Sequence, residues 1–268
     1  MALLDVDGGR RIYYEYVPGS GHTILLSHGW GMSCRVWDNT SALLADAGFG
    51  VLAYDHRACG GSDKDFTDVS IAALGRDVVA LCDAADLDTV ILNGWSLGGA
   101  VAVDAAVRLG SRVRGLVLTT AATPRFTRTG SFPHGGTARD VEATVKALRA
   151  DRATFLHGLY FDGVFAMDVG EPVKRWAWQL ALQASPAADA SLGALAELDQ
   201  RESLRALPIP ALVFVGTEDG VVSPEIGRAA AELLPASRIV ELAGCGHAPF
   251  LERPDAYHRE LMSFLGDL

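Results

Sequence analysis

The feature that most constrains this chain is a serine between two glycines, placed where a short apolar run meets a helix of small residues. Val90-Ile91-Leu92 has the character of a buried parallel strand, and Ala100 to Val107 that of a helix packed on a sheet. Between them stands Gly94-Trp95-Ser96-Leu97-Gly98. So tight a strand-to-helix turn strains the serine backbone, and the glycines leave room for it because they have no side chain. Ser96 is therefore a candidate nucleophile, exposed at the carboxyl end of a strand.

Short apolar strands alternate with helices in both the first and the last part of the chain. Strands are predicted at 11–17, 22–27, 50–54, 90–92, 113–119, 211–216 and 237–242, and helices at 37–47, 70–85, 100–107, 224–234 and 254–265. We expect the first strand to form a hairpin with the residues before it. The alternation is typical of an α/β fold, with a mostly parallel sheet covered by helices on both faces.

The pattern changes in the middle of the chain, where helices follow one another without a convincing strand. Helices are predicted at 140–148, 152–160, 173–182 and 192–198, with Asp151 as the N-cap of the second. A helical insertion between two sheet strands predicts a cap over the carboxyl edge of the sheet. We therefore predict a core formed by residues 1–122 and 206–268, interrupted by a helical cap at residues 123–205.

A serine hydroxyl is a weak nucleophile until a base removes its proton, and one histidine stands in the right setting. His247 lies in a loop after the last predicted strand, which ends at the same sheet edge as Ser96. Asp219 follows the strand before it, where a carboxylate would orient the imidazole. Glu218 is the competing acid, and the Gly216-x-x-Asp219 spacing favours Asp219. The other loop histidines, such as His258, are expected at the surface.

Charge that develops on a substrate oxygen needs backbone donors, and two are expected. The N–H of Leu97 lies at the start of the helix after Ser96, and the loop His28-Gly29-Trp30-Gly31 can offer the N–H of Trp30. Trp30 and Leu97 are therefore the candidate oxyanion hole. Cys34 and Cys245 are also expected near the site, but Ser96 is the favoured nucleophile.

These motifs together resemble the α/β-hydrolase superfamily over essentially the whole chain. The matching segments are His28-Gly29-Trp30-Gly31, Asp55-x-Arg57, Gly94 to Gly99, Gly216-x-x-Asp219 and Gly246-His247. The order serine, aspartate, histidine is the order of that superfamily. One departure is Ala58, where the Asp-x-Arg-Gly loop of the family usually has glycine.

Two branches of the superfamily are similar in finer detail. Trp30, the Trp95-Ser96-Leu97 turn and His247-Ala248-Pro249-Phe250 resemble the pimeloyl-carrier-protein methyl ester carboxylesterases. The loop at 55–62 is similar to the cofactor-free haloperoxidase and esterase branch. The first resemblance implies a substrate channel with Trp30 at its inner end. Its expected lining is Phe155, Leu156, Leu159 and Val221. The alternative is that Phe155 and Leu156 only pack the cap helices.

The resemblance implies a serine esterase that cleaves a small-molecule carboxylic ester through an acyl-enzyme, with no cofactor and no metal. The same residues would serve hydrolysis of a lactone, an amide or a carbon–carbon bond, or perhydrolysis, in which peroxide replaces water. A non-catalytic ligand receptor on this fold is the alternative from another class.

Composition limits the partners and the compartment. The formal net charge of −10 argues against general nucleic-acid binding. The sequence has no run of eighteen apolar residues, so no membrane span is predicted. The first residues lack the basic and apolar regions of a signal peptide, so none is expected there. The four cysteines lie far apart without metal-ligand spacing, which is typical of reduced thiols in a cytoplasmic protein.

One stretch departs from the acidic character of the whole. Residues 125–152 hold six basic and three acidic side chains. Arg139 and Lys146 fall opposite Val141 and Val145 on the predicted helix, so they should face solvent. An ordinary solvated helix face is one interpretation. The resemblance to the carrier-protein esterases implies another, a docking surface for an acidic acyl-carrier protein.

Overall fold

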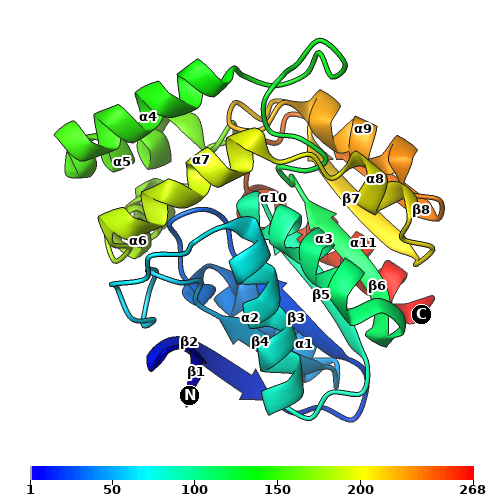
Figure 1. Ribbon diagram of the computed structural model, residues 1–268. Coiled ribbons are helices and arrows are strands. Elements are labelled where there is room, and N and C mark those ends of the chain that lie inside the picture. Colours follow the sequence, from blue (N-terminus) through cyan, green and yellow to red (C-terminus); the bar gives the residue numbers. More distant parts are fainter. Residues whose placement is uncertain (1) are drawn as a thin grey trace.

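One eight-stranded sheet organises residues 2–268, the part of the chain that the computed structural model describes (Figure 1). Its strand order is β1-β2-β4-β3-β5-β6-β7-β8. The strands are β1 (Ala2–Asp7), β2 (Arg10–Val17), β3 (Thr23–Ser27), β4 (Gly50–Tyr54), β5 (Val90–Trp95), β6 (Val113–Thr119), β7 (Ala211–Gly216) and β8 (Ser237–Leu242). The pairs β1–β2 and β2–β4 are antiparallel and the other neighbours are parallel. The predicted α/β fold and its first hairpin are confirmed.

The central strands are buried on both faces, which explains their continuous apolar runs. Successive residues of β3 alternate between the two faces. Leu25 packs into one hydrophobic core, opposite Leu52 and Leu92 in the strand register. Ile24 and Leu26 pack into the other core, on the far face. A strand with two buried faces has no polar alternation, so the sequence pattern predicted these strands by their length and flanking turns.

Helices cover both faces of the sheet, as predicted. They are α1 (Asp38–Asp46), α2 (Ile71–Ala84), α3 (Leu97–Leu109), α8 (Arg201–Arg205), α9 (Pro224–Leu233), α10 (Pro249–Glu252) and α11 (Pro254–Gly266). Helices α2, α3 and α9 contribute to one core, and α1 and α11 to the other. The short helices α8 and α10 were not predicted, because four or five residues are too few to show helical periodicity.

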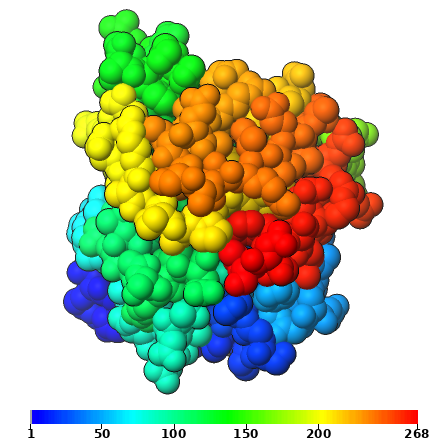
Figure 2. Space-filling model, turned by 90° about the vertical axis from the view of Figure 1, so that its right-hand side faces the viewer, coloured from blue at the N-terminus to red at the C-terminus, as the bar shows by residue number. Residues whose placement is uncertain are grey.

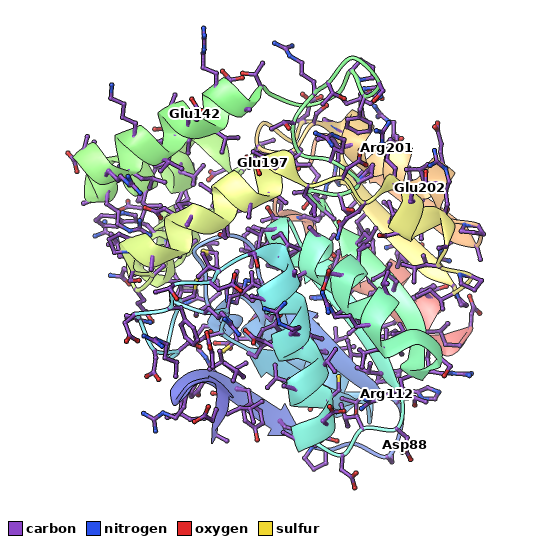
Figure 3. The ribbon with its side chains drawn as sticks, viewed as in Figure 1. Asp88, Arg112, Glu142, Glu197, Arg201 and Glu202 are labelled. Carbon is purple, nitrogen blue, oxygen red and sulfur yellow. The ribbon has the colours of Figure 1, made fainter. Side chains whose placement is uncertain are left out.

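Four of the helices between β6 and β7 lie over the carboxyl edge of the sheet (Figure 1). They are α4 (Ala138–Ala150), α5 (Arg152–Gly158), α6 (Glu171–Ala181) and α7 (Ala190–Glu197), and we call them the cap helices. Figure 3 labels Glu142 on α4 and Glu197 on α7 at this edge, and Asp88 and Arg112 at the opposite end, where β5 and β6 begin. In Figure 2 a green segment from this region stands out above the surface that the C-terminal elements cover.

The cap differs from the prediction at one helix. Asp151 is the N-cap of α5, as predicted, and its side chain accepts a hydrogen bond from the N–H of Thr154 at 3.1 Å. The helix does not continue to residue 160, because the chain widens after Gly158 into a π-helical turn, Leu159–Gly163. Such turns are frequent at functional sites. The limits of core and cap at residues 122/123 and 205/206 stay a prediction.

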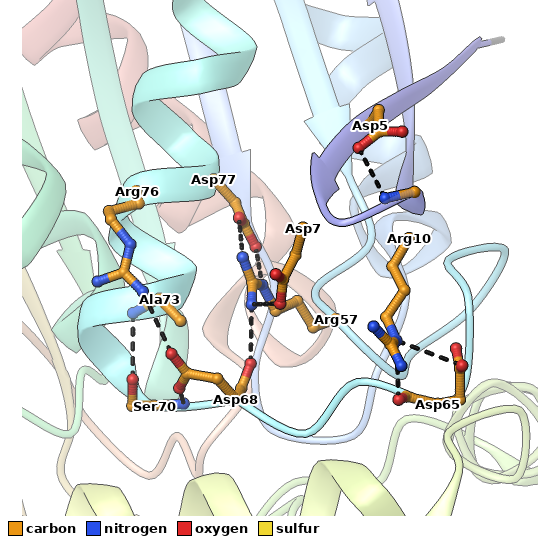
Figure 4. Close-up of polar contacts among 11 residues, drawn as sticks. Asp5, Asp7, Arg10, Arg57, Asp65, Asp68, Ser70, Ala73, Arg76 and Asp77 are labelled. Carbon is orange, nitrogen blue, oxygen red and sulfur yellow. Dashed lines mark hydrogen bonds and ion pairs between the residues drawn. The ribbon is translucent and has the colours of Figure 1, made fainter.

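A buried ion pair fixes the segment after β4. The Arg57 guanidinium donates to both carboxylate oxygens of Asp77 on α2, at 2.6 and 2.7 Å, and both side chains are buried (Figure 4). It also donates to Asp7 of β1 and to the carbonyl of Asp68. Removing one partner of such a pair leaves the other partner as a buried charge without a countercharge. This cluster lies on the β1 side of the sheet and serves the fold.

Two expectations about side-chain exposure have different outcomes. His258 is not at the surface, because its helix, α11, packs on the sheet and its Nε2 pairs with the Thr40 hydroxyl at 3.0 Å. The four cysteines are free thiols, as predicted, and all four are buried. Within the described residues, no helix is both long and apolar enough to cross a membrane.

Candidate active site

Ser96 stands at the junction of β5 and α3 with strained backbone. Its φ and ψ are 56° and −123°, in a region that residues with side chains rarely adopt. Such strain costs about 1–3 kcal/mol and persists only where the surroundings enforce it. Here the Ser96 N–H donates to the Thr119 carbonyl at 3.1 Å, and the Ser96 carbonyl accepts from Gly99 and Ala122, both at 2.9 Å. These bonds hold the predicted turn.

The glycines around Ser96 are required by close packing of backbone. A Cβ at Gly98 would lie 2.4 Å from the carbonyl oxygens of both Ser27 and His28. A Cβ at Gly94 would lie 2.2 Å from the Gly98 carbonyl oxygen. Both distances are far below van der Waals contact, so the two glycines of the motif let the helix start directly against the strands.

His247 and Asp219 form a buried hydrogen-bonded pair. The distance from His247 Nδ1 to Asp219 Oδ2 is 2.8 Å. The other carboxylate oxygen, Oδ1, accepts from the N–H groups of Val221 and Val222 at 2.8 and 2.9 Å. The neighbouring Glu218 is exposed. Of the two candidate acids, the structure therefore brings Asp219 to the imidazole.

The backbone of His247 is fixed from three sides. Its carbonyl accepts from the indole N–H of Trp95 and from the Thr120 hydroxyl, both at 2.7 Å. Its N–H donates to the carbonyl of Val164, after the π-helical turn of the cap, at 2.9 Å. The histidine loop is thus held by the strand that carries Ser96, by the end of β6 and by the cap.

Ser96 and His247 line one cavity of about 270 Å³ between the sheet edge and the cap helices. The side chains around it are almost all apolar or aromatic, and none of the lining residues is Asp, Glu, Lys or Arg. The lining residues are Gly29, Trp30, Trp95, Ser96, Leu97, Ala122, Phe126, Val141, Thr144, Phe155, Leu159, Tyr160, Gly163, Val164, Leu192, Leu195, Gly220, Val221 and His247. An apolar cavity with a few polar groups is the usual form of a small-molecule site.

Four of the five predicted pocket residues reach this cavity, namely Trp30, Phe155, Leu159 and Val221. Leu156 does not. It is fully buried in the hydrophobic core that contains Ile24 and Leu26 and continues into the cap helices, because one helical step turns it about 100° from Phe155. Sequence analysis missed Phe126, Tyr160 and the α7 residues Leu192 and Leu195, whose apolar side chains carry no signal that separates a cavity wall from a helix core.

The two expected oxyanion donors also border the cavity. Trp30 follows β3, and Leu97 is the first residue of α3. Within residues 2–268 neither backbone N–H donates to a protein acceptor, so both are available to a substrate oxygen. The Trp30 side chain is held separately, because its indole N–H donates to the Ala188 carbonyl of the cap at 3.2 Å.

The cysteines near the site are poor nucleophiles. Burial raises the pKa of the Cys245 thiol to about 12, and the Glu252 charge adds to this rise. Burial also raises the pKa of Cys34, with Asp55 adding to the effect. A thiol must lose its proton to react. Neither cysteine lines the cavity, whereas Ser96 does.

The chain belongs to the alpha/beta hydrolase fold family, whose sequence model matches residues 22–254. It is therefore a hydrolase of this fold.

Individual relatives cover nearly the whole chain. It is 32% identical to a pimeloyl-[acyl-carrier protein] methyl ester esterase of Stenotrophomonas maltophilia (strain K279a), over 94% of this chain and 96% of that protein. It is 28% identical to a non-heme chloroperoxidase of Streptomyces lividans, over 97% of both chains. Among solved structures, an esterase from Exiguobacterium antarcticum is similar with a TM-score of 0.94 and 27% identity, covering 98% of each chain.

Proposed function

We propose that this hydrolase is a serine esterase that cleaves a carboxylic ester through an acyl-enzyme. The observation that carries the proposal is the meeting of three features at one apolar cavity. These are the strained Ser96, the His247–Asp219 pair at 2.8 Å and the two unpaired N–H groups of Trp30 and Leu97. The esterase relatives support it.

In the proposed reaction, His247 Nε2 takes the proton of the Ser96 hydroxyl as Ser96 Oγ attacks the ester carbonyl carbon. The carbonyl oxygen becomes an oxyanion, and the Trp30 and Leu97 N–H groups stabilise it. When the tetrahedral intermediate collapses, the carbon–oxygen bond to the alcohol breaks and His247 returns the proton to the alcohol. Asp219 stabilises the imidazolium throughout. Water then attacks the acyl-enzyme by the same steps and releases the acid.

The lining of the cavity favours an uncharged acyl group. A charged group that enters a cavity without a countercharge loses hydration that nothing replaces, which costs several kcal/mol. We therefore expect neutral aliphatic or aromatic acyl groups to be preferred over acyl groups that end in a carboxylate. A second cavity, with more polar lining, adjoins the first and shares Phe126, Val141, Thr144, Gly220 and Val221 with it. This second cavity has room for a polar alcohol portion of the ester substrate.

Other reactions on the same residues remain candidates. Lactone, amide and carbon–carbon bond hydrolysis need the same nucleophile, base and oxyanion donors. Perhydrolysis would replace water by peroxide in the second half-reaction. The similarity to a chloroperoxidase is the reason to test this reaction. A receptor without catalysis would bind a ligand in the same cavity and would not turn it over.

A carrier-bound ester is a second candidate substrate, favoured by the esterase relative that acts on an acyl-carrier protein. Arg139, Lys146 and Arg149 on α4 are exposed, as predicted for the first two. Arg125 and Arg152 are paired with Asp199 and Asp189 instead, so the free basic surface is smaller than the sequence suggested. Steering by such a surface would act on the association rate and weaken with salt.

The experiment is a turnover screen of the purified protein with panels of neutral and carboxylate-ended esters, lactones and amides, with and without peroxide. We expect the highest kcat/KM with neutral esters. Turnover of lactones, amides or peroxide-dependent products at higher kcat/KM would replace the ester assignment. Ligand binding without any turnover would favour the receptor.

The carrier-bound substrate is tested by reversing the charges with Arg139→Glu, Lys146→Glu and Arg149→Glu. Selective loss of kcat/KM for a carrier-bound ester, removed at high ionic strength, supports docking. Equal rates on the free and the bound ester, before and after the substitutions, would leave a small-molecule esterase.

A further inference from the structure

The carboxylate of Glu252, which the proposed reaction does not use, is a buried junction beside the site. It accepts hydrogen bonds from four backbone N–H groups. Oε2 accepts from Ala166, Met167 and Gly246 at 2.9, 3.0 and 2.9 Å, and Oε1 accepts from Ala248 at 3.0 Å. The residue is only 8% exposed, and no lysine, arginine or histidine of the described chain forms a salt bridge with it. Four backbone donors therefore surround this carboxylate.

The four donors come from two segments that are far apart in the chain. Gly246 and Ala248 are the residues on either side of His247. Ala166 and Met167 follow the π-helical turn Leu159–Gly163 and lie two and three residues after Val164. Val164 both lines the cavity and accepts the His247 N–H. Glu252 thus ties the histidine loop to the wall of the cavity.

The approach of the two segments is too close for a side chain at residue 246. A Cβ at Gly246 would lie 2.6 Å from the Ala166 nitrogen and 2.8 Å from the Val164 carbonyl oxygen. Glycine at this position therefore lets the two backbones meet, and Glu252 supplies the acceptor that their N–H groups then need. Without it, the buried N–H groups of Gly246 and Ala248 would lose their partner, at about 1–3 kcal/mol each, and Ala166 and Met167 would lose their half-buried bonds to it.

We propose that Glu252 is a positioning residue, which holds the His247 imidazole in register with Ser96 by bonding the loop of the histidine to the cavity wall. The proposal rests on the proposed function, in which His247 is the base. Hydrogen bonds to a carboxylate are stronger than those between neutral groups, so four of them on one side chain make a stiff junction. Misplacement of a catalytic group by about 1 Å can cost on the order of 10²-fold in rate.

The test compares Glu252→Gln with a matched control, Asp77→Asn. Glutamine keeps the size of the side chain, but if its amide oxygen takes the three N–H groups at Oε2, its NH₂ faces the Ala248 N–H, donor against donor. Asp77 is a buried carboxylate as well, and its partner Arg57 lies away from the cavity. Both variants should be less stable in urea unfolding. Only Glu252→Gln should lose kcat, by up to about 10²-fold, with a smaller rise in KM.

A second readout separates position from catalysis. In histidine-selective NMR, with the His247 signals assigned from a His247→Gln variant, Glu252→Gln should shift the His247 imidazole signals, whereas Asp77→Asn should not. Unchanged His247 signals in Glu252→Gln would overturn the positioning role. Shifted signals with unchanged kcat would also overturn the positioning role, because the imidazole would change without any effect on turnover. Full kcat in the His247→Gln variant would instead overturn His247 as the base, which is the proposed function.

If Glu252→Gln does not fold, the wild type still gives an answer. The amide protons of Ala166, Met167, Gly246 and Ala248 lie outside the ladders of the sheet, yet all four should exchange slowly with solvent deuterium if the junction is stiff. Glu252→Asp, which keeps the charge but is one methylene shorter, should speed their exchange. Fast exchange of these amides in the wild type would contradict the proposal.

Discussion

Single residues decide how the site works, and the neighbours Glu218 and Asp219 show how sharply. The exposed Glu218 does not contact the imidazole, whereas Asp219 bonds His247 Nδ1 and is itself held by two N–H groups. We expect Asp219→Asn to lower kcat by on the order of 10⁴, because the imidazole loses its orienting acceptor. Glu218→Gln should stay near the wild-type rate. Steady-state kinetics of both variants on one ester decide this, and a crippled Glu218→Gln would make Glu218 the acid.

The role of a single residue could be predicted from the sequence only where a short motif surrounds that residue. Ser96 and His247 sit in short motifs whose glycines meet nearby backbone, so their positions could be predicted. Leu156 was expected in the pocket and is fully buried in the cap core, because the sequence does not fix the rotation of a helix to one residue. The hydrogen bonds of Glu252 could not be predicted from the sequence around it, since its partners Ala166 and Met167 come from a distant segment.

At the scale of elements, α5 and the turn after it form one wall of the cavity. Phe155 on α5 and Leu159 at the start of the π-helical turn both line it. Helical periodicity predicted one helix through residue 160, because the pattern of apolar residues does not record a widened turn. Six of the seven predicted strands, by contrast, agree with the structure to within one residue at each end, since most of them are short apolar runs bounded by turns. The seventh, β5, continues to Trp95, three residues past the predicted end at residue 92.

Substituting Phe155→Ala tests this wall. Removing the ring enlarges the cavity, so we expect kcat/KM to fall for short acyl chains and to fall less, or rise, for long ones. The measurement is kcat/KM over a series of straight-chain esters for the variant and the wild type. Leu156→Ala, which alters the core behind the wall, serves as the control. A uniform loss across all chain lengths in Phe155→Ala would mean that Phe155 only packs the cap helices.

At the scale of the whole molecule, a buried histidine pair links stability to pH. His28 follows β3 and His56 follows β4, and their rings stack with centroids 3.9 Å apart. The backbone N–H of His56 donates to His28 Nε2 at 2.9 Å. Burial lowers the pKa of both imidazoles from the ordinary 6.5, and the pKa of His56 lies well below it. The folded protein therefore keeps both rings neutral at a pH where the unfolded chain takes up protons.

The sign of the effect follows from this difference. Above about pH 6.5 both states are neutral and the full stability is present. As the pH falls below that value the unfolded chain binds protons that the folded protein does not, so the free energy of unfolding drops by up to about 1.4 kcal/mol per pH unit for each histidine. Urea unfolding at pH 5 to 8 should show the decline, and His56→Gln should reduce its slope. An equal slope in wild type and variant would contradict the role of His56.

A covalent acyl-enzyme on Ser96 can be detected by mass spectrometry of the intact protein after reaction with a fluorophosphonate probe, which mimics the acyl step. We expect one adduct per chain, located on the peptide that contains Ser96, and none on Ser96→Ala with the fold intact. His247→Gln should slow the labelling strongly, because the serine would lack its base. Labelling of Ser96→Ala at the wild-type rate, or an adduct on another residue, would contradict the account.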